Sequence, residues 1–279
     1  MTPLKSRSWR KRLVLWLALL VGIWVMLRWL ERYLVYIPSA HFEATGKELG
    51  RPCEDVFFAA SDGVRLNGWF YPADPNSPRS ALVILLLHGN AGNISHRLGY
   101  YQVWLKLGVN VLALDYRGYG RSQGHPSEEG TYRDAQAAYQ WLRQKGFAPT
   151  HLIALGESLG GGVACELAMR ETVGGLVLQS SFTSVPDLGK ELYPWLPVRW
   201  MSTIKYDTLA KLPRLTCPVL VMHSRNDELI RFHHGERNFA AAREPKLFWE
   251  LAGGHNYTLD AGRARYAEGL EKFLATYFK

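Results

Sequence analysis

The stretch Gly156-Glu157-Ser158-Leu159-Gly160 decides the fold of this chain because of what stands on either side of it. The apolar run 151–155 before it is typical of a short buried strand, and residues 160–171 after it favour a helix. A G-x-S-x-G sequence at a strand-to-helix junction forms a nucleophile elbow, a sharp turn that holds the serine hydroxyl clear of the sheet. The glycines are needed because a Cβ would clash where strand and helix approach closely. The pattern alone is loose, and a glycine-rich turn can carry it by chance.

Further strands are predicted before and after the elbow. Residues 54–60 and 65–71 are predicted as strands joined by the turn 61–63, and mostly apolar runs predict strands at 81–87, 109–114, 151–155, 175–178, 218–222 and 246–251. Helices are predicted between them at 95–107, 128–145, 160–171, 233–243 and 260–278. Buried strands that alternate with helices indicate an α/β fold, with a mostly parallel sheet covered by helices on both faces.

One connection is much longer than a crossover requires. Residues 182–215, between the predicted strands 175–178 and 218–222, indicate a small cap over the carboxyl edge of the sheet, where ligands bind in such folds. Trp195, Trp200 and Met201 in this segment either line an acyl pocket or pack the cap on the body of the domain. The sequence leaves both roles open.

A serine hydroxyl needs an oriented base to act as a nucleophile at neutral pH. In chains that use this elbow the order is serine, then an acid, then histidine. Of the nine histidines, His255 alone follows a late strand, in a loop at the same sheet edge as Ser158. His88 and His223 also follow strands, but both precede the position expected for the base. His255 is therefore the predicted base.

The acid is expected after the strand before the last. Asp227 lies in the loop that follows strand 218–222, and the interval to His255 accommodates one helix and one strand. Its predicted task is to fix the imidazole tautomer and to favour the imidazolium that forms on proton transfer. Asp187 in the cap is the alternative acid, whereas Asp115 is expected to brace the turn at 117–120.

Two backbone N–H groups are expected to bind the oxyanion. One is that of Leu159, directly after the serine, and the other is that of Asn90, in the loop after strand 81–87. The alternative for residues 88–93 is a glycine-rich turn in which Asn93 or Ser95 caps the next helix.

Neither a metal nor an organic cofactor is predicted. The sequence lacks the C-x-x-C, G-x-G-x-x-G and G-K-[ST] patterns of metal and nucleotide sites. Cys165 falls in the helix after the serine and is expected in the core, whereas a bridge between Cys53 and Cys217 stays open.

The N-terminal segment, residues 1–37, differs from the rest. Its basic head contains Lys5, Arg7, Arg10, Lys11 and Arg12. Residues 13–30 are then apolar except for Arg28, and at about 1.5 Å per residue they span about 27 Å, close to the thickness of a bilayer core. The basic head is expected to stay cytoplasmic, which predicts a single-pass signal anchor with the remainder on the other side. A cleaved signal peptide is the alternative, although charged residues rather than a small-x-small site follow the apolar core.

The formal charge of +8 belongs mostly to this N-terminal segment. Its basic head carries five positive charges and residues 28–37 add one, which leaves +2 for residues 38–279. The net positive charge of the chain therefore gives no support for nucleic-acid binding. Residues 38–279 are long enough for one α/β domain with a sizeable core.

Taken together, these motifs resemble those of the α/β-hydrolases. The resemblance rests on HGNAGN (88–93), DYRGYGRS (115–122), GESLG (156–160) and the ordered pair Asp227 and His255. The anchor, HGNAGN and LYPWLPVRW (192–200) make the chain similar to the BEM46-like subgroup. This subgroup includes bacterial membrane-anchored hydrolases and is akin to eukaryotic protein depalmitoylases. Its domains are also often labelled serine-aminopeptidase-like. The resemblance implies an eight-stranded hydrolase fold and ester or thioester hydrolysis. Ser224 departs from it, because relatives often have glycine there.

The sequence thus predicts a membrane-anchored serine hydrolase that acts on a small-molecule or lipid-like acyl substrate. An aminopeptidase on the same residues is one alternative, with Glu191 or Asp187 binding the substrate ammonium. A non-catalytic, membrane-tethered binding domain is the other, since a fold alone does not establish activity. The oligomeric state does not follow from the sequence.

Overall fold

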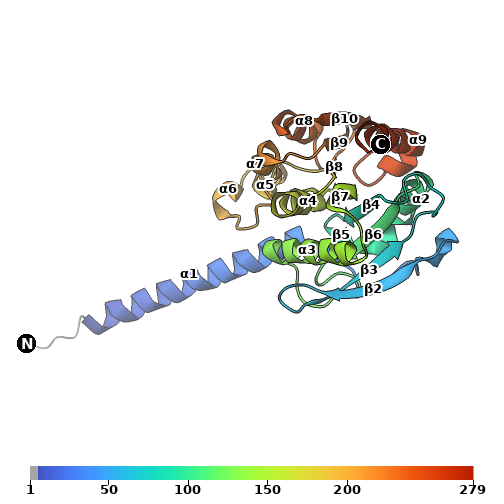
Figure 1. The fold of residues 1–279 in the computed structure, drawn as a ribbon. Helices are drawn as coiled ribbons and strands as arrows, with labels where there is room; N and C mark the ends of the chain where they lie inside the picture. Colours follow the sequence, from blue (N-terminus) through green and yellow to red (C-terminus); the bar gives the residue numbers. More distant parts are fainter. Residues whose placement is uncertain (1–5, 279) are drawn as a thin grey trace, which may run out of the picture. The chain divides into compact units, whose positions relative to one another are not determined.

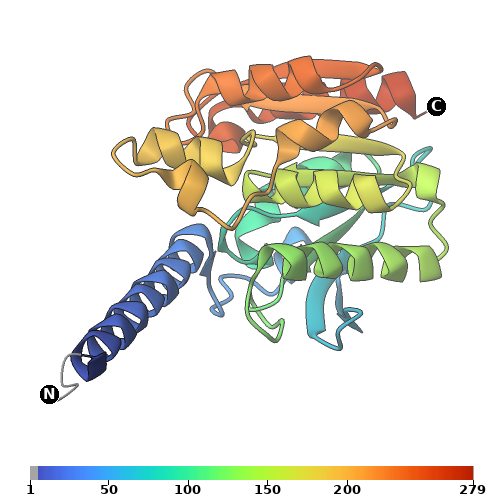
Figure 2. The ribbon, with the colours of Figure 1, turned by 90° about the vertical axis from the view of Figure 1, so that its left-hand side faces the viewer.

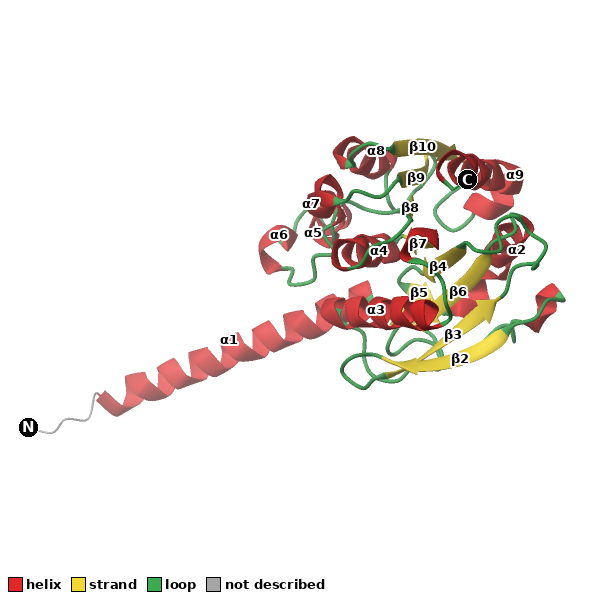
Figure 3. Ribbon diagram, in the orientation of Figure 1, coloured by secondary structure: helices red, strands yellow, loops and turns green. Residues whose placement is uncertain are grey.

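The computed structural model describes residues 6–278, apart from the side chains of residues 6–8 and 10. Lys5 of the predicted basic head lies outside the described residues, as do the side chains of Arg7 and Arg10. The chain separates into two compact units, Met1–Ile37 and Pro38–Lys279. Figure 3 distinguishes helices, strands and loops by colour.

The first unit consists mainly of one long helix, α1 (Ser6–Val35). Its 25-residue part Lys11–Val35 is long and apolar enough to cross a membrane, judged by length and composition, a test that a signal sequence also passes. None of the most apolar stretch is buried. Within it Arg28 forms an ion pair with Glu31, at 3.0 Å between Nη1 and Oε2, so the charge in the apolar stretch has a partner one turn away.

The second unit is built on an eight-stranded sheet with the order β10-β9-β8-β7-β4-β6-β3-β2 (Figure 1). β3 pairs antiparallel with both of its neighbours, β2 and β6, and the other neighbouring strands are parallel. The strands are β2 (Glu54–Ala59), β3 (Arg65–Tyr71), β4 (Val83–Leu87), β6 (Asn110–Asp115), β7 (Leu152–Glu157), β8 (Gly175–Gln179), β9 (Val219–Ser224) and β10 (Lys246–Leu251). The predicted α/β class and mostly parallel sheet are confirmed.

Helices cover both faces of the sheet. Their bounds are α2 (Leu98–Lys106), α3 (Glu128–Gln144), α4 (Leu159–Arg170), α8 (Phe232–Ala241) and α9 (Thr258–Tyr277). Helices α2 and α9 contact each other on one face, and α3, α4 and α8 lie on the other, in front of the sheet in Figure 2. Because both faces are covered, every residue of β4, β6 and β8 is buried, which explains why their sequences do not alternate.

The register of the parallel strands brings their carboxyl ends to one edge. Leu87 at the end of β4 pairs with Gly156 of β7, and Glu157 pairs with Gln179 at the end of β8. On the far side Leu251 at the end of β10 pairs with Ser224 at the end of β9. The loops that carry the predicted site residues therefore leave the sheet at the same edge.

Some predicted boundaries were wrong by a few residues. Strand 81–87 begins at Val83, because the residues before it belong to a turn. The predicted helix 95–107 divides into the 3₁₀ turn η2 (Ile94–Arg97) and α2, because the side chain of Asn93 accepts a hydrogen bond from the Ser95 N–H and caps η2. His151 lies in the 3₁₀ turn η3 (Pro149–His151) and not in β7.

Short helices make up the segment 182–215. They are α5 (Val185–Leu192), α6 (Val198–Met201), α7 (Thr208–Lys211) and the 3₁₀ turn η4 (Leu212–Arg214). Ser184 caps α5 by accepting a hydrogen bond from the Asp187 N–H. Helix α5 contacts α6, whereas α7 contacts α4 and α8 of the core. The remaining short elements are β1 (Ile37–Pro38), η1 (Lys47–Leu49) and β5 (Ala91–Gly92).

The cysteines form no disulfide in the described part of the chain, which contains all three of them. The bridge between Cys53 and Cys217, which the sequence left open, is therefore not formed in this structure. Cys165 is buried in α4 as predicted, and burial raises the pKa of its thiol.

Candidate active site

Ser158 sits at the turn between β7 and α4 in a conformation that only a tight turn imposes. Its φ of 53° and ψ of −114° lie in a region that side chains other than glycine rarely adopt. Its N–H donates to the Gln179 carbonyl at 2.9 Å, and its carbonyl accepts from the Ser181 hydroxyl at 2.8 Å. A Cβ on Gly160 would lie 1.8 Å from the Leu87 carbonyl oxygen, so glycine is required there. The local structure is the strained strand-to-helix turn expected of a nucleophile elbow.

His255 lies between Ser158 and Asp227. Its Nε2 is 3.2 Å from the Ser158 hydroxyl, and its Nδ1 is 2.8 Å from Oδ2 of Asp227. The His255 N–H donates to Glu228 at 3.0 Å, which fixes the loop that carries the imidazole. The structure thus brings together the three side chains that sequence reasoning selected, from loops after β7, β9 and β10.

The surroundings of His255 act on its pKa in opposite directions. Burial, the largest effect, disfavours the charged imidazolium and lowers the pKa. The hydrogen bond and the charge of Asp227, together with the carboxylates of Glu157 and Glu228, outweigh it, so the pKa of His255 is raised overall. The site therefore favours the imidazolium more than water does.

Asp227 is almost fully buried and held from several sides. Its Oδ1 accepts from the N–H groups of Leu229 at 3.1 Å and Ile230 at 2.7 Å, which leaves Oδ2 for His255. His223, one of the histidines considered for the base, lies 3.5 Å from the same Oδ2. Its Nε2 is 2.7 Å from the Ile230 carbonyl oxygen, and burial lowers its pKa. His223 thus packs beside the acid and does not approach Ser158 within hydrogen-bond distance.

The other candidate acids have different partners. Asp187 accepts from the Thr183 hydroxyl at 3.0 Å and from Arg199 at 2.7 Å, and it forms an ion pair with Arg237 of α8 at 3.3 Å. Asp115 is fully buried against the turn it was expected to brace, since a Cβ on Gly120 would lie 1.9 Å from its Oδ2. The Asp115 carboxylate also accepts from the Ile94 N–H at 2.9 Å.

A buried ion pair beneath the elbow was not predicted. Glu157, the residue before Ser158, lies 3.1 Å from Arg97 of η2, and Arg97 also donates to the carbonyls of Ala91 and Asn93. Burial would raise the pKa of Glu157, but the Arg97 guanidinium outweighs it and lowers that pKa. An acidic residue at the end of a buried strand requires a cationic partner. The position of Glu157 in the sequence could therefore have predicted that an arginine or lysine lies beside it.

Ser224, the one departure from the resemblance, joins the two loops of the site. Its hydroxyl donates to the Gly253 carbonyl and accepts from the Asn226 N–H at 3.1 Å. The loop of Asp227 and the loop of His255 are therefore connected through this side chain. Sequence reasoning missed this contact because its partner, Gly253, lies in the loop after another strand.

The loop 88–93 runs beside the elbow. A Cβ on Gly89 would lie 3.4 Å from the Cβ of Ser158. The carbonyl of Asn90 accepts from the Tyr119 hydroxyl at 2.8 Å, and the buried Asn93 side chain donates to the carbonyl of His41 at 2.7 Å. These contacts fix the loop next to Ser158. The capping role considered as the alternative is also present, because the Asn93 side chain accepts from the Ser95 N–H at 3.0 Å. The N–H groups of Asn90 and Leu159 stay the predicted oxyanion donors.

The aromatic residues of the cap face solvent. Trp195 is 73% exposed and Trp200 is 93% exposed, whereas Met201 is half-buried. The two indoles therefore do not enclose a pocket in this structure. The acids considered for an aminopeptidase are also occupied: Asp187 by Arg199, and Glu191 by His233 at 2.9 Å. Neither carboxylate is unpaired, as an ammonium site would require.

Among the described residues, a cluster of three side chains has the composition and spacing of a cation site. It consists of Glu191, His233 and His234, whose donor atoms lie within 4.8 Å of one another. None of the three belongs to the predicted triad. The cluster lies between α5 of the cap and α8 of the core.

Comparison with known proteins agrees with the fold. Residues 83–212 match the model of the α/β-hydrolase fold family. The α/β-hydrolase domain-containing protein WAV2 of Arabidopsis thaliana is 32% identical over 282 residues, which cover 92% of this chain and 91% of WAV2. The lysophosphatidylserine lipase ABHD12 of Danio rerio is 36% identical over 184 residues, 59% of this chain and 48% of the lipase. An esterase of Pyrococcus furiosus has the same fold, with a TM-score of 0.71 at 22% identity over 88% of this chain and 98% of the esterase.

Proposed function

The chain belongs to the α/β-hydrolase family, and we propose that it is a membrane-anchored serine hydrolase that cleaves carboxylic ester or thioester bonds. The observation that carries the proposal is the position of His255, whose two ring nitrogens face Ser158 and Asp227 at 3.2 and 2.8 Å. A base within hydrogen-bond reach of a nucleophile, oriented in turn by a buried acid, is the arrangement that activates a hydroxyl.

In the proposed reaction Ser158 attacks the acyl carbonyl while Nε2 of His255 takes the hydroxyl proton. Asp227 holds Nδ1 protonated and stabilises the imidazolium that forms. The tetrahedral intermediate collapses when His255 returns the proton to the leaving group, which gives an acyl-enzyme. Water, deprotonated by the same imidazole, then attacks the acyl-enzyme and releases the acid.

The negative oxygen of the intermediate is proposed to accept hydrogen bonds from the N–H groups of Leu159 and Asn90. Leu159 is the first residue of α4, where the N–H groups are not used by the helix itself and the dipole favours negative charge. The neighbouring residue Gly89 packs against Ser158, which supports Asn90 as the second donor. Such preorganised donors each contribute about 10²–10³ to turnover.

Helix α1 is proposed to anchor the domain in a membrane. The basic residues before it are expected to stay cytoplasmic, which puts residues 38–279 on the non-cytoplasmic side. A lipid-like acyl substrate follows as a proposal from that location and from the relative named a lysophosphatidylserine lipase. The aminopeptidase is less well supported, because the acids considered for its ammonium site, Asp187 and Glu191, are paired with Arg199 and His233. The non-catalytic alternative is less well supported, because Ser158, Asp227 and His255 are present and His255 lies within hydrogen-bond distance of the other two.

Hydrolysis of p-nitrophenyl esters, acyl thioesters and aminoacyl anilides by the full chain in detergent tests the reaction class. We expect ester and thioester turnover that exceeds anilide turnover. Ser158→Ala should lower ester turnover by roughly 10⁴-fold or more, as removal of a serine nucleophile does elsewhere. Faster cleavage of anilides would favour the aminopeptidase, and equal ester turnover by Ser158→Ala would exclude the proposed nucleophile.

A further inference from the structure

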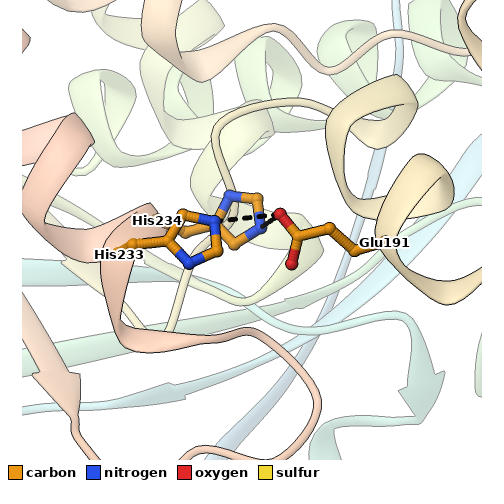
Figure 4. Close-up of side chains that lie close together, drawn as sticks. All are labelled: Glu191, His233 and His234. Carbon is orange, nitrogen blue, oxygen red and sulfur yellow. Dashed lines mark hydrogen bonds and ion pairs between the residues drawn. The ribbon is translucent and has the colours of Figure 1, made fainter.

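The cluster Glu191–His233–His234 joins the cap to the core. Glu191 lies on α5, and the two histidines are adjacent residues in the first turn of α8 (Figure 4). The imidazole rings are stacked at 4.5 Å between centroids, and both Nε2 atoms face the same carboxylate oxygen. We propose that these three side chains bind a divalent transition-metal ion of the zinc type.

The spacing of the donor atoms fits such an ion. Oε1 of Glu191 is 2.9 Å from Nε2 of His233 and 3.2 Å from Nε2 of His234. Tetrahedral zinc with bonds of about 2.0–2.1 Å separates its ligand atoms by about 3.3 Å. Small side-chain movements would therefore place all three donors around one ion.

Two polar atoms of the cluster have no hydrogen bond among the described residues. Nε2 of His234 is one of them, although the side chain is fully buried and this atom lies 3.2 Å from Oε1 of Glu191. Oε2 of Glu191 is the other. Buried polar atoms without partners are rare in folded proteins and cost free energy. An ion bound between them would give the buried Nε2 a ligand bond.

The far side of the His234 ring contacts Thr183 of the cap. Nδ1 is 2.9 Å from the Thr183 hydroxyl, which in turn donates to Asp187 at 3.0 Å. The Thr183 N–H also lies 3.1 Å from Nδ1. Metal binding at Nε2 places the imidazole proton on Nδ1, which then donates to the Thr183 hydroxyl and gives up the contact from the N–H. This chain from imidazole through hydroxyl to carboxylate orients the ligand.

The type of ligand selects the type of ion. Imidazole nitrogens favour zinc and its transition-metal neighbours, whereas magnesium and calcium prefer oxygen ligands. The His233 side chain is 42% exposed, so an ion can enter from solvent and water can complete the coordination. A bound ion would tie α5 of the cap to α8 of the core. None of the three ligands takes part in the proposed hydrolytic step, so the two proposals stand or fall separately.

Zinc binding by the full chain, purified in detergent without a histidine tag, tests the site. After removal of metal with a chelator, the protein is titrated with zinc chloride, desalted and analysed for metal content. The wild type should retain about one zinc per chain and unfold at a higher temperature with zinc than without it. His233→Ala and Glu191→Gln should each weaken zinc binding at least tenfold, and Thr183→Val by about 10–100-fold.

The control variant is His151→Ala, which removes a histidine on η3 outside the cluster and should bind zinc like the wild type. His233 is partly exposed, so its replacement tests the site without disturbing the core. The proposal is overturned if the folded wild type retains no zinc, or if His233→Ala and Glu191→Gln bind zinc as tightly as the control. Both outcomes are judged from zinc binding alone, so a failure of the proposed ester hydrolysis would not affect this test.

Discussion

The carboxyl edge of the sheet and the cap, residues 182–215, are stabilised in different ways. At the edge, backbone hydrogen bonds and the buried pair Glu157–Arg97 hold Ser158 in a strained conformation. The cap consists of helices of eight, four and four residues, and its indoles Trp195 and Trp200 face solvent. Many contacts hold the edge, whereas residues 191–201 of the cap include no buried residue.

This difference separates two requirements of the proposed function. Proton transfer needs atoms held within hydrogen-bond distance, and only a closely packed framework keeps them there. Substrate contact tolerates variation, and segments outside the sheet can provide it. A replacement at the edge should therefore disrupt folding or abolish the reaction. A replacement in the cap should change only how fast particular substrates are turned over.

Two glycine replacements give the largest expected contrast. A Cβ on Gly160 would lie 1.8 Å from the carbonyl oxygen of Leu87, a backbone atom of the central sheet that cannot move away. Gly160→Ala should therefore prevent folding or lower the free energy of unfolding by more than about 4 kcal/mol. On α5 of the cap, a Cβ on Gly189 would meet a methyl group of Val198 at 2.7 Å, which a side-chain shift can relieve.

Gly189→Ala should change the free energy of unfolding by about 1 kcal/mol or less, since the better helix propensity of alanine offsets part of the crowding. Thermal unfolding of the full chain in detergent measures both variants. A Gly160→Ala protein as stable as Gly189→Ala would show that the edge is not the more rigid region.

The pH dependence of ester turnover tests the edge by itself. Only neutral His255 can accept the serine proton, and its pKa is raised, so turnover should fall with decreasing pH through an inflection above the ordinary histidine value of about 6.5. In Asp227→Asn burial still lowers this pKa while the opposing charge is gone, so the inflection should move to lower pH. The variant should also lose about 10⁴ in kcat, because the imidazole tautomer is no longer fixed.

Measurement of kcat/KM for a p-nitrophenyl ester from pH 5 to 9 gives the inflection, and kcat at saturating ester gives the loss in turnover. An inflection that stays at the same pH in Asp227→Asn would contradict the assigned role of this carboxylate. A matched variant in the cap, Asp187→Asn, should leave the inflection unchanged, since Asp187 contacts Thr183 and Arg199 and not His255.

Replacement of the cap indoles should have the smallest effect. Trp195→Ala and Trp200→Ala remove side chains that are 73% and 93% exposed, so the free energy of unfolding should change by no more than about 0.5 kcal/mol. If the indoles contact the acyl chain, turnover of dodecanoyl esters should fall severalfold while turnover of acetyl esters is kept. Equal losses for both esters would discard an acyl-binding role.

The sequence identified those features of the site that follow from chain order. The elbow motif, the order Ser158, Asp227, His255 and the parallel sheet together predict which side chains meet at one edge. Arg97, Glu228 and Ser224 were missed, because each acts through a partner on another segment that no local pattern reveals. The cap indoles show a different limit, since an aromatic residue type does not say whether the side chain is buried or exposed.

Labelling with a fluorophosphonate tests the central claim most directly, because this reagent reacts with a serine only when a base and an oxyanion site activate it. The full chain in detergent is treated with the reagent, and the modified peptide is identified by mass spectrometry. The account predicts one modified residue, Ser158, and no labelling of folded Ser158→Ala. A folded wild type that does not react, or a Ser158→Ala protein that reacts equally, would contradict it.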